Sequence, residues 1–522
     1  MKRRFKMLSP VAVASLTLLV ALPVLAASKP YINPEAIQAD ITTGALMSHL
    51  VALDNIATAN NGNRAFGLPG YTASVDYIWE RVSNIPGTRA WKQDFSSLFD
   101  QVLSIDFKVD GQSIHVVGLA YSPSTNEEGI TAQLVHGPEG EAGCHDDSYR
   151  NLDVKGKIVL IQRWLCPQSG NTTLAGRIFP AARAGASAVI IYQNVDVPVS
   201  SGTLTAPDPE HVPVGFINLS DGLRIKERLE SGGQVQVYFQ HTQIVEQRRS
   251  QNVFVETEDG DPDNIIILGA HLDSVQEGPG INDNASGSSL ILEVFRAAVK
   301  YRTRNKIRFA WWGGEENGLV GSRYYCTGLR TSEVESILAY LNFDMVSRGY
   351  FGVGDGDGSL TGVPAPPGSD VIERIYTSYF KSKGLEPTEA RFTNGSDYAS
   401  FWKYLNKPIG YLHTGTAEAQ DPCYHQACDT IGNANPQILT INAKVSFQDS
   451  DPFCAALTSF QQAAAYMLSV LSTDGSALIR KQPTNATMLD SLRIKSLNAG
   501  FDVDHGKLEV MGQRHVGCGL EI

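Results

Sequence analysis

The sequence predicts an α/β protein: a mixed, mostly parallel central sheet flanked by helices, with a small β-rich α+β domain inserted into it. Two apolar runs, at 264–270 and 307–312, are continuous rather than alternating, as in strands that helices cover on both faces. Ionisable residues follow each run, His271 after the first and Glu315 and Glu316 after the second. Ligands of open α/β sheets bind beyond the ends of such strands, so we expect the functional site at this edge.

The amino terminus has the pattern of a secretory signal peptide, which we assign to residues 1–26. Basic residues precede a short apolar run and a small-residue site near Ala26. An uncleaved membrane anchor is the alternative, but the run is short for a bilayer span, and no later stretch is long and apolar enough for one. We therefore expect a secreted protein with no membrane partner, either extracellular or carried by the secretory route to a vacuole or periplasm.

Composition excludes one class of partner. The chain has 522 residues, enough for two or three domains at about 150 residues each. Its formal net charge of −12 argues against nucleic acid, because proteins that bind nucleic acid carry basic surfaces. The hydrophobic fraction of 42% and the charged fraction of 19% are those of an ordinary globular protein.

Seven cysteines occur in a chain whose secretion permits disulfides. Cys423 and Cys428 indicate a short disulfide that stiffens the loop between them, with two free thiols as the alternative. Cys144 and Cys166 flank one predicted strand and are candidates for a second bridge, although connectivity does not follow from sequence. A glycosylating host has five Asn-x-Ser/Thr sequons to use, at Asn171, Asn218, Asn284, Asn394 and Asn485. We expect Asn284 to stay unmodified because it lies within the predicted site.

Residues 27–109 and 241–473 are assigned to the main domain, whose first part is expected to be helical. Helical spacing of apolar residues is clearest at 72–82. The nearby cluster of Arg64, Gly67, Pro69 and Gly70 indicates a loop or a helix start. The role we expect for it is to pack the opening helices onto the sheet.

Residues 110–240 form the predicted inserted domain. Gly, Pro and Asp clusters separate short β-rich runs at 115–119, 131–135, 157–163, 188–192 and 235–239, and one helix is expected at about 174–186. Potential ligands do not gather at the ends of these runs, so we expect this domain to carry no chemistry of its own.

From about residue 250, strands alternate with helices. The expected strands lie at 252–255, 264–270, 307–312, 337–346 and 408–412. The expected helices lie at 286–301, 320–328, 370–384 and 397–403, with a last one at about 452–472. Residues 474–522 are set apart as a C-terminal extension without an assigned role.

Five residues are the predicted metal ligands: His271, Asp283, Glu316, Asp344 and His425. Zn²⁺ accepts such nitrogen and oxygen donors, and carboxylates gathered at strand ends repel one another without a cation. Two metal ions about 3.5–4 Å apart need a bridging carboxylate, for which Asp283 is the candidate. His271 and Asp344 are then expected to complete one ion and Glu316 and His425 the other, which leaves each ion an open position for water.

Neighbours of these ligands have predicted roles as well. Glu315 is the expected general base, taking a proton from the attacking water and returning it to the leaving amine. Asp273 follows the first ligand by two residues and Asp429 follows the last by four, and each is expected to orient that ligand's imidazole. Tyr424 is a candidate to hydrogen-bond an oxyanion, with packing as the alternative.

At these residues the sequence resembles a known family. Between residues 271 and 429, the segments HLDSV, GPGINDNASG, WWGGEENGLVGS, NFDMV, GSDYASF and CYHQACDT are similar to motifs of the di-zinc aminopeptidases related to leucyl aminopeptidase and aminopeptidase Y. The segments VKGKIVLIQRWLCP and ARAGASAVIIYQN resemble the protease-associated domain inserted in many such enzymes. Together the similarities cover residues 40–472 or so.

The resemblance implies a zinc exopeptidase fold of the phosphorylase/hydrolase-like kind and two Zn²⁺ per chain. It implies release of N-terminal residues, often large apolar ones such as Leu, from peptides with a free N-terminus. The family's metal ligands fall on the five residues named above and its base on Glu315. Its Ser-Asp-[His/Tyr] segment matches Ser396, Asp397 and Tyr398, which we expect to wall and support the site.

Three other functions share parts of this pattern. A metallocarboxypeptidase needs a cation to bind the substrate's C-terminal carboxylate, for which Arg323 and Arg391 are the nearest candidates in sequence. A non-catalytic receptor-like ectodomain should have lost ligands, whereas all five and the base are present. A two-metal phosphatase is disfavoured by the family resemblance.

Overall fold

The computed structural model describes residues 29–166, 174–199, 201–417, 419–443, 463–484 and 486–498. The predicted signal peptide, the segment 444–462 and the chain after 498 lie outside these ranges, as do Cys454, Cys518 and the sequons at Asn171 and Asn485. Within the described ranges, we find no helix whose length and apolar character suit it to cross a bilayer.

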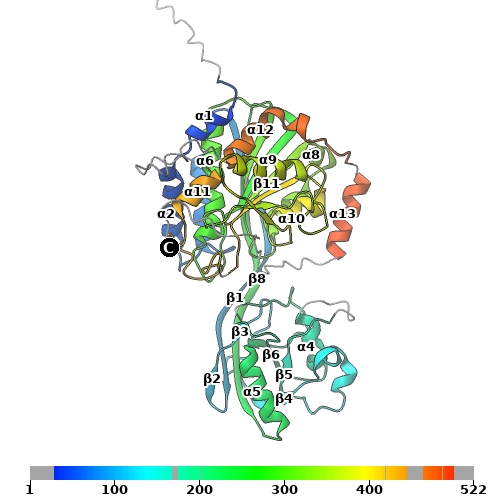
Figure 1. The fold of residues 1–522 in the computed structure, drawn as a ribbon. Coiled ribbons are helices and arrows are strands. Elements are labelled where there is room, and N and C mark those ends of the chain that lie inside the picture. Colours follow the sequence, from blue (N-terminus) through cyan, green and yellow to red (C-terminus); the bar gives the residue numbers. More distant parts are fainter. Residues whose placement is uncertain are drawn as a thin grey trace, which may run out of the picture.

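A long two-stranded ribbon joins the two bodies of the fold (Figure 1). Its strands are β1 (Thr88–Val109) and β8 (Gln236–Thr257), which pair antiparallel from end to end. One end of β8 pairs with β10 of the larger body and the other with β4 of the smaller body. The ribbon thus belongs to both sheets, and the expected boundary after residue 240 falls inside β8.

The sheet of the larger body confirms the mixed, mostly parallel architecture. Its order is β13-β12-β14-β11-β9-β10-β8. The pairs β9–β10, β9–β11, β11–β14 and β12–β13 are parallel, and β12–β14 and β8–β10 are antiparallel. The strands are β9 (Asp261–His271), β10 (Asn305–Trp312), β11 (Ile337–Phe343), β12 (Gly352–Gly354), β13 (Thr388–Ala390) and β14 (Ile409–His413).

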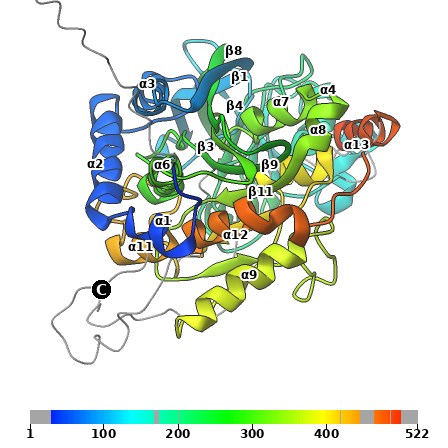
Figure 2. The ribbon, with the colours of Figure 1, turned by 90° about the horizontal axis from the view of Figure 1, so that it is seen from above.

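Helices cover both faces of this sheet (Figure 2). Along β9, Ile266 and Leu268 belong to one apolar core and Ile265 and Ile267 to the other. The first core is covered by α2 (Thr43–Ala59), α3 (Pro69–Val82), α6 (Ser286–Ala298), α9 (Ser369–Ser382), α11 (Pro436–Ala443) and α12 (Ala463–Leu478). The second is covered by α7 (Val320–Gly328), α8 (Thr331–Ser336), the π-helix η5 (Phe401–Leu405) and α13 (Ala486–Asn498).

The smaller body is an α/β unit with a helix on each face of its sheet. Parallel β4 (Ile130–His136), β5 (Ile158–Gln162), β6 (Ala188–Tyr192) and β7 (Val214–Ile217) are followed by antiparallel β3 (Val117–Gly118). The helix α4 (Leu174–Arg183) packs on one face and α5 (Leu219–Glu230) on the other.

The strand β1 and the helix α5 are among the elements that were not predicted. The strand β1 is half-exposed along most of its length, so its apolar residues do not mark one face. The helix α5 does carry an apolar face, with Leu219, Ile225 and Leu229 packed against the sheet, and the sequence prediction did not include it. Cross-strand pairing, rather than local pattern, establishes β1.

Candidate active site

The parallel strands β9, β10, β11 and β14 bring their carboxyl ends to one edge of the sheet. His271 is the last residue of β9, Glu315 and Glu316 follow β10 closely, and Asp344 follows β11 directly. Asp283 lies in the short π-helical segment η4 (Ile281–Ala285) that leads into α6, and His425 lies in the loop after β14. The structure therefore brings all five predicted ligands together.

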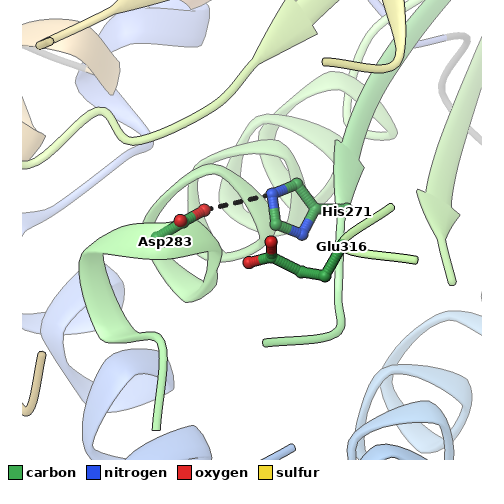
Figure 3. Close-up of side chains that lie close together, drawn as sticks. All are labelled: His271, Asp283 and Glu316. Carbon is green, nitrogen blue, oxygen red and sulfur yellow. Dashed lines mark ion pairs between the residues drawn. The ribbon is translucent and has the colours of Figure 1, made fainter. Parts of the chain in front are cut away.

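Asp283 stands between the two histidines. His271 Nε2 lies 3.2 Å from Asp283 Oδ1 and 3.3 Å from Asp344 Oδ1. His425 Nε2 lies 3.2 Å from Asp283 Oδ2 and 3.1 Å from Glu316 Oε2. Each oxygen of Asp283 thus faces a different histidine–carboxylate pair, and Figure 3 shows its carboxylate directed at His271 with Glu316 beside them.

This donor set fits metal ions. Asp344 Oδ1 and Glu316 Oε1 are buried and have no hydrogen-bond partner, so a metal ion at this position would supply the partner that these oxygens lack. Burial lowers the pKa of His271, but the carboxylates of Asp344 and Glu315 outweigh it, so the pKa lies well above its usual value. The surplus negative charge attracts protons, and it would attract metal ions in the same way.

The glutamates after β10 have perturbed acidities. Burial raises the pKa of Glu316 to about 7, with the charge of His425 opposing it. Burial, joined by the charges of Glu316 and Asp344, also raises the pKa of Glu315 well above its usual value, against the opposing charge of His271. A carboxylate whose pKa is raised accepts a proton more readily than an ordinary carboxylate does, which suits it to general acid–base work.

Asp273 contacts the expected imidazole and also the loop that carries the two glutamates. His271 Nδ1 lies 3.1 Å from the backbone oxygen of Asp273 but 3.7 Å from its carboxylate, which is too far for a hydrogen bond. The carboxylate instead accepts hydrogen bonds from the backbone N–H groups of Glu315 at 3.2 Å and Glu316 at 3.3 Å. Asp273 therefore contacts the imidazole through its backbone oxygen, as an orienting residue would, and holds the glutamate loop through its side chain.

Asp429 likewise supports the bridging residue rather than His425. Its carboxylate accepts hydrogen bonds from the backbone N–H groups of Asn282 at 2.9 Å and Asp283 at 3.0 Å. The side-chain amide of Asn433 donates a third at 2.8 Å. Sequence proximity to His425 suggested the wrong partner, because the loop folds back onto η4.

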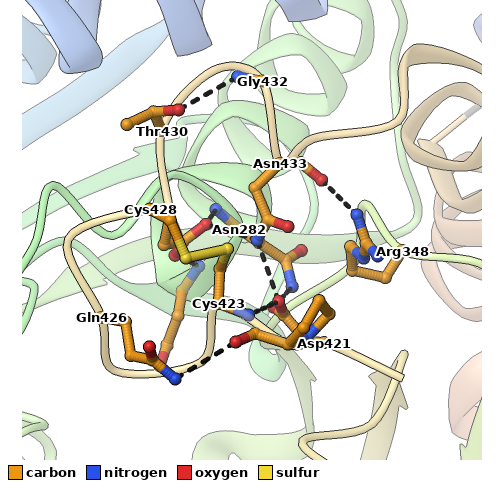
Figure 4. Close-up of a disulfide and its surroundings, with 12 residues drawn as sticks. Asn282, Arg348, Asp421, Cys423, Gln426, Cys428, Thr430, Gly432 and Asn433 are labelled. Atoms are coloured by element: carbon orange, nitrogen blue, oxygen red, sulfur yellow. Dashed lines mark hydrogen bonds between the residues drawn. A yellow bond between two sulfur atoms is a disulfide. The ribbon is translucent and has the colours of Figure 1, made fainter. Parts of the chain in front are cut away.

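A disulfide closes the loop that carries His425 (Figure 4). Cys423 and Cys428 are bonded, as are Cys144 and Cys166 in the smaller body, and both bridges confirm the predicted candidates. His425 has a φ of 55°, in the left-handed region that non-glycine residues rarely adopt. The loop therefore holds this histidine in a conformation that its own backbone preference would not select.

Tyr424 lies against the site with its ring stacked on that of His425, the centroids 3.8 Å apart. Burial, joined by the charges of Asp283 and Glu316, raises the pKa of Tyr424 well above its usual value. The hydroxyl therefore stays protonated at neutral pH and remains a hydrogen-bond donor.

Close backbone approach explains two of the site's glycines. A Cβ at Gly313 would meet the hydroxyl of Tyr71 at 2.2 Å, and one at Gly278 would meet the backbone oxygen of Gln426 at 2.2 Å. The first contact packs the glutamate loop on α3. The second packs the loop after β9 on the disulfide loop, so a side chain at either position would separate elements that carry site residues.

Several supporting residues surround the ligands. Three of them lie where the sequence predicted, and the contacts of a fourth were not predicted. Ser396 donates a hydrogen bond to Asp344 Oδ2 at 2.6 Å, and Asp397 is buried behind the site, where burial raises its pKa to about 7. Tyr398 accepts a hydrogen bond from the backbone of Thr393. Arg64 was expected only as part of a loop or a helix start, yet its guanidinium donates to backbone oxygens of the loop after β9.

The pocket at this edge is lined by His271, Asp283, Glu315, Glu316, Asp344, Met345, Gly395, Thr416, Tyr424 and His425. Neither Arg323 nor Arg391 is among the described residues that line it, so these two candidates for the cation of a carboxypeptidase lie outside this lining. Asn284 is fully buried and its side chain donates to the backbone of Phe343, which leaves no room for a glycan.

Comparison with known proteins agrees with this geometry. Peptidase family M28 matches residues 252–448, the part of the chain that holds all five predicted ligands. A probable lipoprotein aminopeptidase of Mycobacterium tuberculosis is 36% identical over 448 residues, covering 80% of this chain and 87% of the relative. The chain belongs to peptidase family M28. This M28 peptidase also matches the PA domain over residues 130–225, within the smaller body.

Further relatives of this M28 peptidase carry similar names. Leucine aminopeptidase 2 of Trichophyton tonsurans is 33% identical, covering 83% of this chain and 88% of the relative. The solved aminopeptidase from Aneurinibacillus sp. strain AM-1 is 26% identical with a TM-score of 0.65, covering 79% of this chain and 93% of that one. The family resemblance read from the sequence is confirmed, and the chain is a peptidase of family M28 with an inserted PA domain.

Proposed function

We propose that this M28 peptidase is a secreted aminopeptidase that holds two zinc ions and releases large apolar residues such as Leu from peptide N-termini. The observation that carries the proposal is the placement of Asp283, whose two oxygens face separate histidine–carboxylate pairs. His271 and Asp344 would hold one zinc ion and Glu316 and His425 the other, with Asp283 between them.

The chain's own residues suit this chemistry. When bound, zinc supplies Lewis-acid polarisation of the scissile carbonyl and acidifies water. Glu315 accepts the proton of the attacking water and returns it to the leaving amine, and the backbone bond to Asp273 holds its loop in place. Tyr424, a donor at the pocket wall, hydrogen-bonds the oxyanion that develops on the substrate carbonyl.

The composition of the pocket lining supports cleavage at the amino end. The described lining residues include four carboxylates, and neither lysine nor arginine is among them. Two zinc ions would balance the charge of these carboxylates, and the described lining would then offer no arginine or lysine to bind a substrate's C-terminal carboxylate. Met345, Gly395 and Thr416 add uncharged lining. The name of the Trichophyton relatives, leucine aminopeptidase, supports the proposed preference for large apolar residues.

Two observations support secretion. The first 26 residues carry the signal-peptide pattern described above, and the structure contains disulfides in both bodies. Disulfides persist in oxidising compartments and are rare in the cytosol. We therefore propose export through the secretory route.

The test is a panel of aminoacyl p-nitroanilides with free and N-acetylated amino groups, assayed before and after chelation and zinc re-addition. We expect the leucyl substrate to be cleaved fastest, the acetylated substrates to resist, and chelation to abolish activity until zinc returns. Cleavage of the acetylated substrates, or full activity in the presence of chelator, would refute the proposal.

A further inference from the structure

We infer that Arg64 is a positioning residue of the zinc site: its guanidinium fixes the loop between His271 and Asp283 and thereby sets the separation of these two ligands. The inference rests on the proposed di-zinc function. Arg64 lies outside the family match, in the segment before α3, and touches no ligand side chain.

The guanidinium uses all three of its nitrogens on this loop. Nε donates to the backbone oxygen of Pro279 at 2.9 Å, and Nη2 donates to that of Gly280 at 2.6 Å. Nη1 donates to the backbone oxygen of Leu272, the residue after His271. One side chain therefore ties both ends of the stretch that connects the first ligand to the bridging one.

The backbone of Arg64 holds the middle of the same loop. Its N–H donates to Ser274 Oγ at 2.9 Å, and its carbonyl accepts from the N–H of Ser274 at 3.4 Å. Ser274 Oγ in turn donates to the backbone oxygen of Gly278 at 3.0 Å. The loop is thus bound at its start, middle and end to a single residue of another segment.

Burial and charge suit Arg64 to this task. The side chain is 0% exposed, so water does not compete for these bonds. Burial lowers the pKa of Arg64 to about 10, against the opposing charges of Asp273, Asp429 and Asp283, so the guanidinium stays charged at neutral pH. A planar guanidinium offers donors in a fixed fork, whereas an ammonium group offers one compact point of charge. Lysine would keep the charge and lose the geometry.

The chain offers a matched control in Arg177 of the smaller body. Arg177 is also 0% exposed, and its nitrogens likewise donate to three backbone oxygens, those of Gln162, Gly140 and Pro138. Arg177→Lys therefore removes the same kind of buried fork without touching the zinc site. A loss of zinc affinity or activity that is seen only in Arg64→Lys therefore comes from a change at the zinc site rather than from a general loss of stability.

The experiment compares Arg64→Lys and Arg177→Lys in the full chain. Zinc affinity is measured by chelator competition, the absorption spectrum is recorded on the cobalt-substituted protein, and kcat and KM are measured at saturating zinc. We expect Arg64→Lys to weaken zinc binding about 10–100-fold, the range for residues that orient metal ligands, to alter the cobalt spectrum, and to lower kcat more than it raises KM. Arg177→Lys should lower the Tm and leave the zinc affinity, the cobalt spectrum and the kinetic constants unchanged. Wild-type zinc affinity in Arg64→Lys, or an equal loss in Arg177→Lys, would overturn the inference.

Ser274→Ala keeps the inference testable if Arg64→Lys does not fold. It removes the hydroxyl that accepts from the Arg64 N–H and donates to the Gly278 oxygen, and we expect a several-fold weaker zinc affinity with a wild-type circular dichroism spectrum. Unchanged zinc affinity in Ser274→Ala would then count against the inference. Failure of the wild-type chain to bind zinc or release N-terminal residues would instead refute the proposed function, so the two failures are distinguishable.

Discussion

The carboxylate of Asp273 accepts a hydrogen bond from the backbone N–H of Glu315 at 3.2 Å. This bond crosses from the segment after β9 to the segment after β10, two strands that pair in parallel. One buried carboxylate thus places the proposed base relative to the first ligand, His271, whose ring contacts the backbone of the same residue. The position of the proposed base relative to this ligand thus depends on a side chain that is not among the described residues lining the pocket.

Asp273→Asn tests that relationship. Asparagine keeps one oxygen acceptor but replaces the other with a donor, so it cannot accept from both Glu315 and Glu316. We expect kcat to fall about 10–100-fold, with both zinc ions still bound in the presence of excess metal. Steady-state kinetics and zinc analysis check this expectation. Wild-type kcat would show that the loop holds its position without Asp273.

Glu315→Gln separates proton transfer from metal binding. Glutamine occupies the same space but cannot take a proton, so we expect turnover to fall about 10²–10⁴-fold while zinc content is unchanged. Glu316→Gln is the control: because Glu316 faces His425 at 3.1 Å, its loss should lower zinc content as well as activity. Equal activity of Glu315→Gln and wild type would contradict the assignment of Glu315 as the general base.

The five proposed ligands were predictable because each sits next to a strand end or in a short polar loop. A continuous apolar run such as β9 or β10 fixes a buried parallel strand, and the polar residue that follows must then lie at the sheet edge. The division of the other four ligands into two pairs around Asp283 followed because two neighbouring metal ions need a bridging carboxylate. These inferences use local sequence and one fact about parallel sheets.

The supporting contacts were not predictable in the same way. Asp429 and Asp283 are 146 residues apart, and Arg64 lies 215 residues before Pro279. Such bonds depend on how loops fold back in three dimensions, which residue spacing does not record. The same holds for β1, whose partner β8 stabilises it although its own apolar pattern is weak.

Lys407→Met should stabilise the protein at neutral pH. Lys407 is 4% exposed just before β14, and burial together with the charge of Lys481 lowers its pKa from 10.5 to about 8. The unfolded chain therefore binds more protons between pH 8 and 10.5, so the free energy of unfolding rises with pH across this window. Below pH 8 the lysine is charged in both states. The folded state then carries the full free-energy cost of burying the charged ammonium group, about 1–3 kcal/mol.

Chemical unfolding at pH 7 and pH 10 checks this prediction. Lys407→Met should raise the free energy of unfolding at pH 7 and show a smaller gain on moving to pH 10 than wild type does. Lys155→Met, at an exposed position of the smaller body, serves as the control and should follow the wild-type curve. A variant of Lys407 that is less stable at pH 7 would mean that its ammonium group is satisfied in the folded state.

The most direct measurement is a crystal structure of the zinc-loaded enzyme with anomalous data collected at the zinc edge. The proposed function predicts two anomalous peaks about 3.5–4 Å apart, one beside His271 and Asp344 and one beside Glu316 and His425, with Asp283 contacting both. A single peak, or two peaks that do not share Asp283, would contradict it.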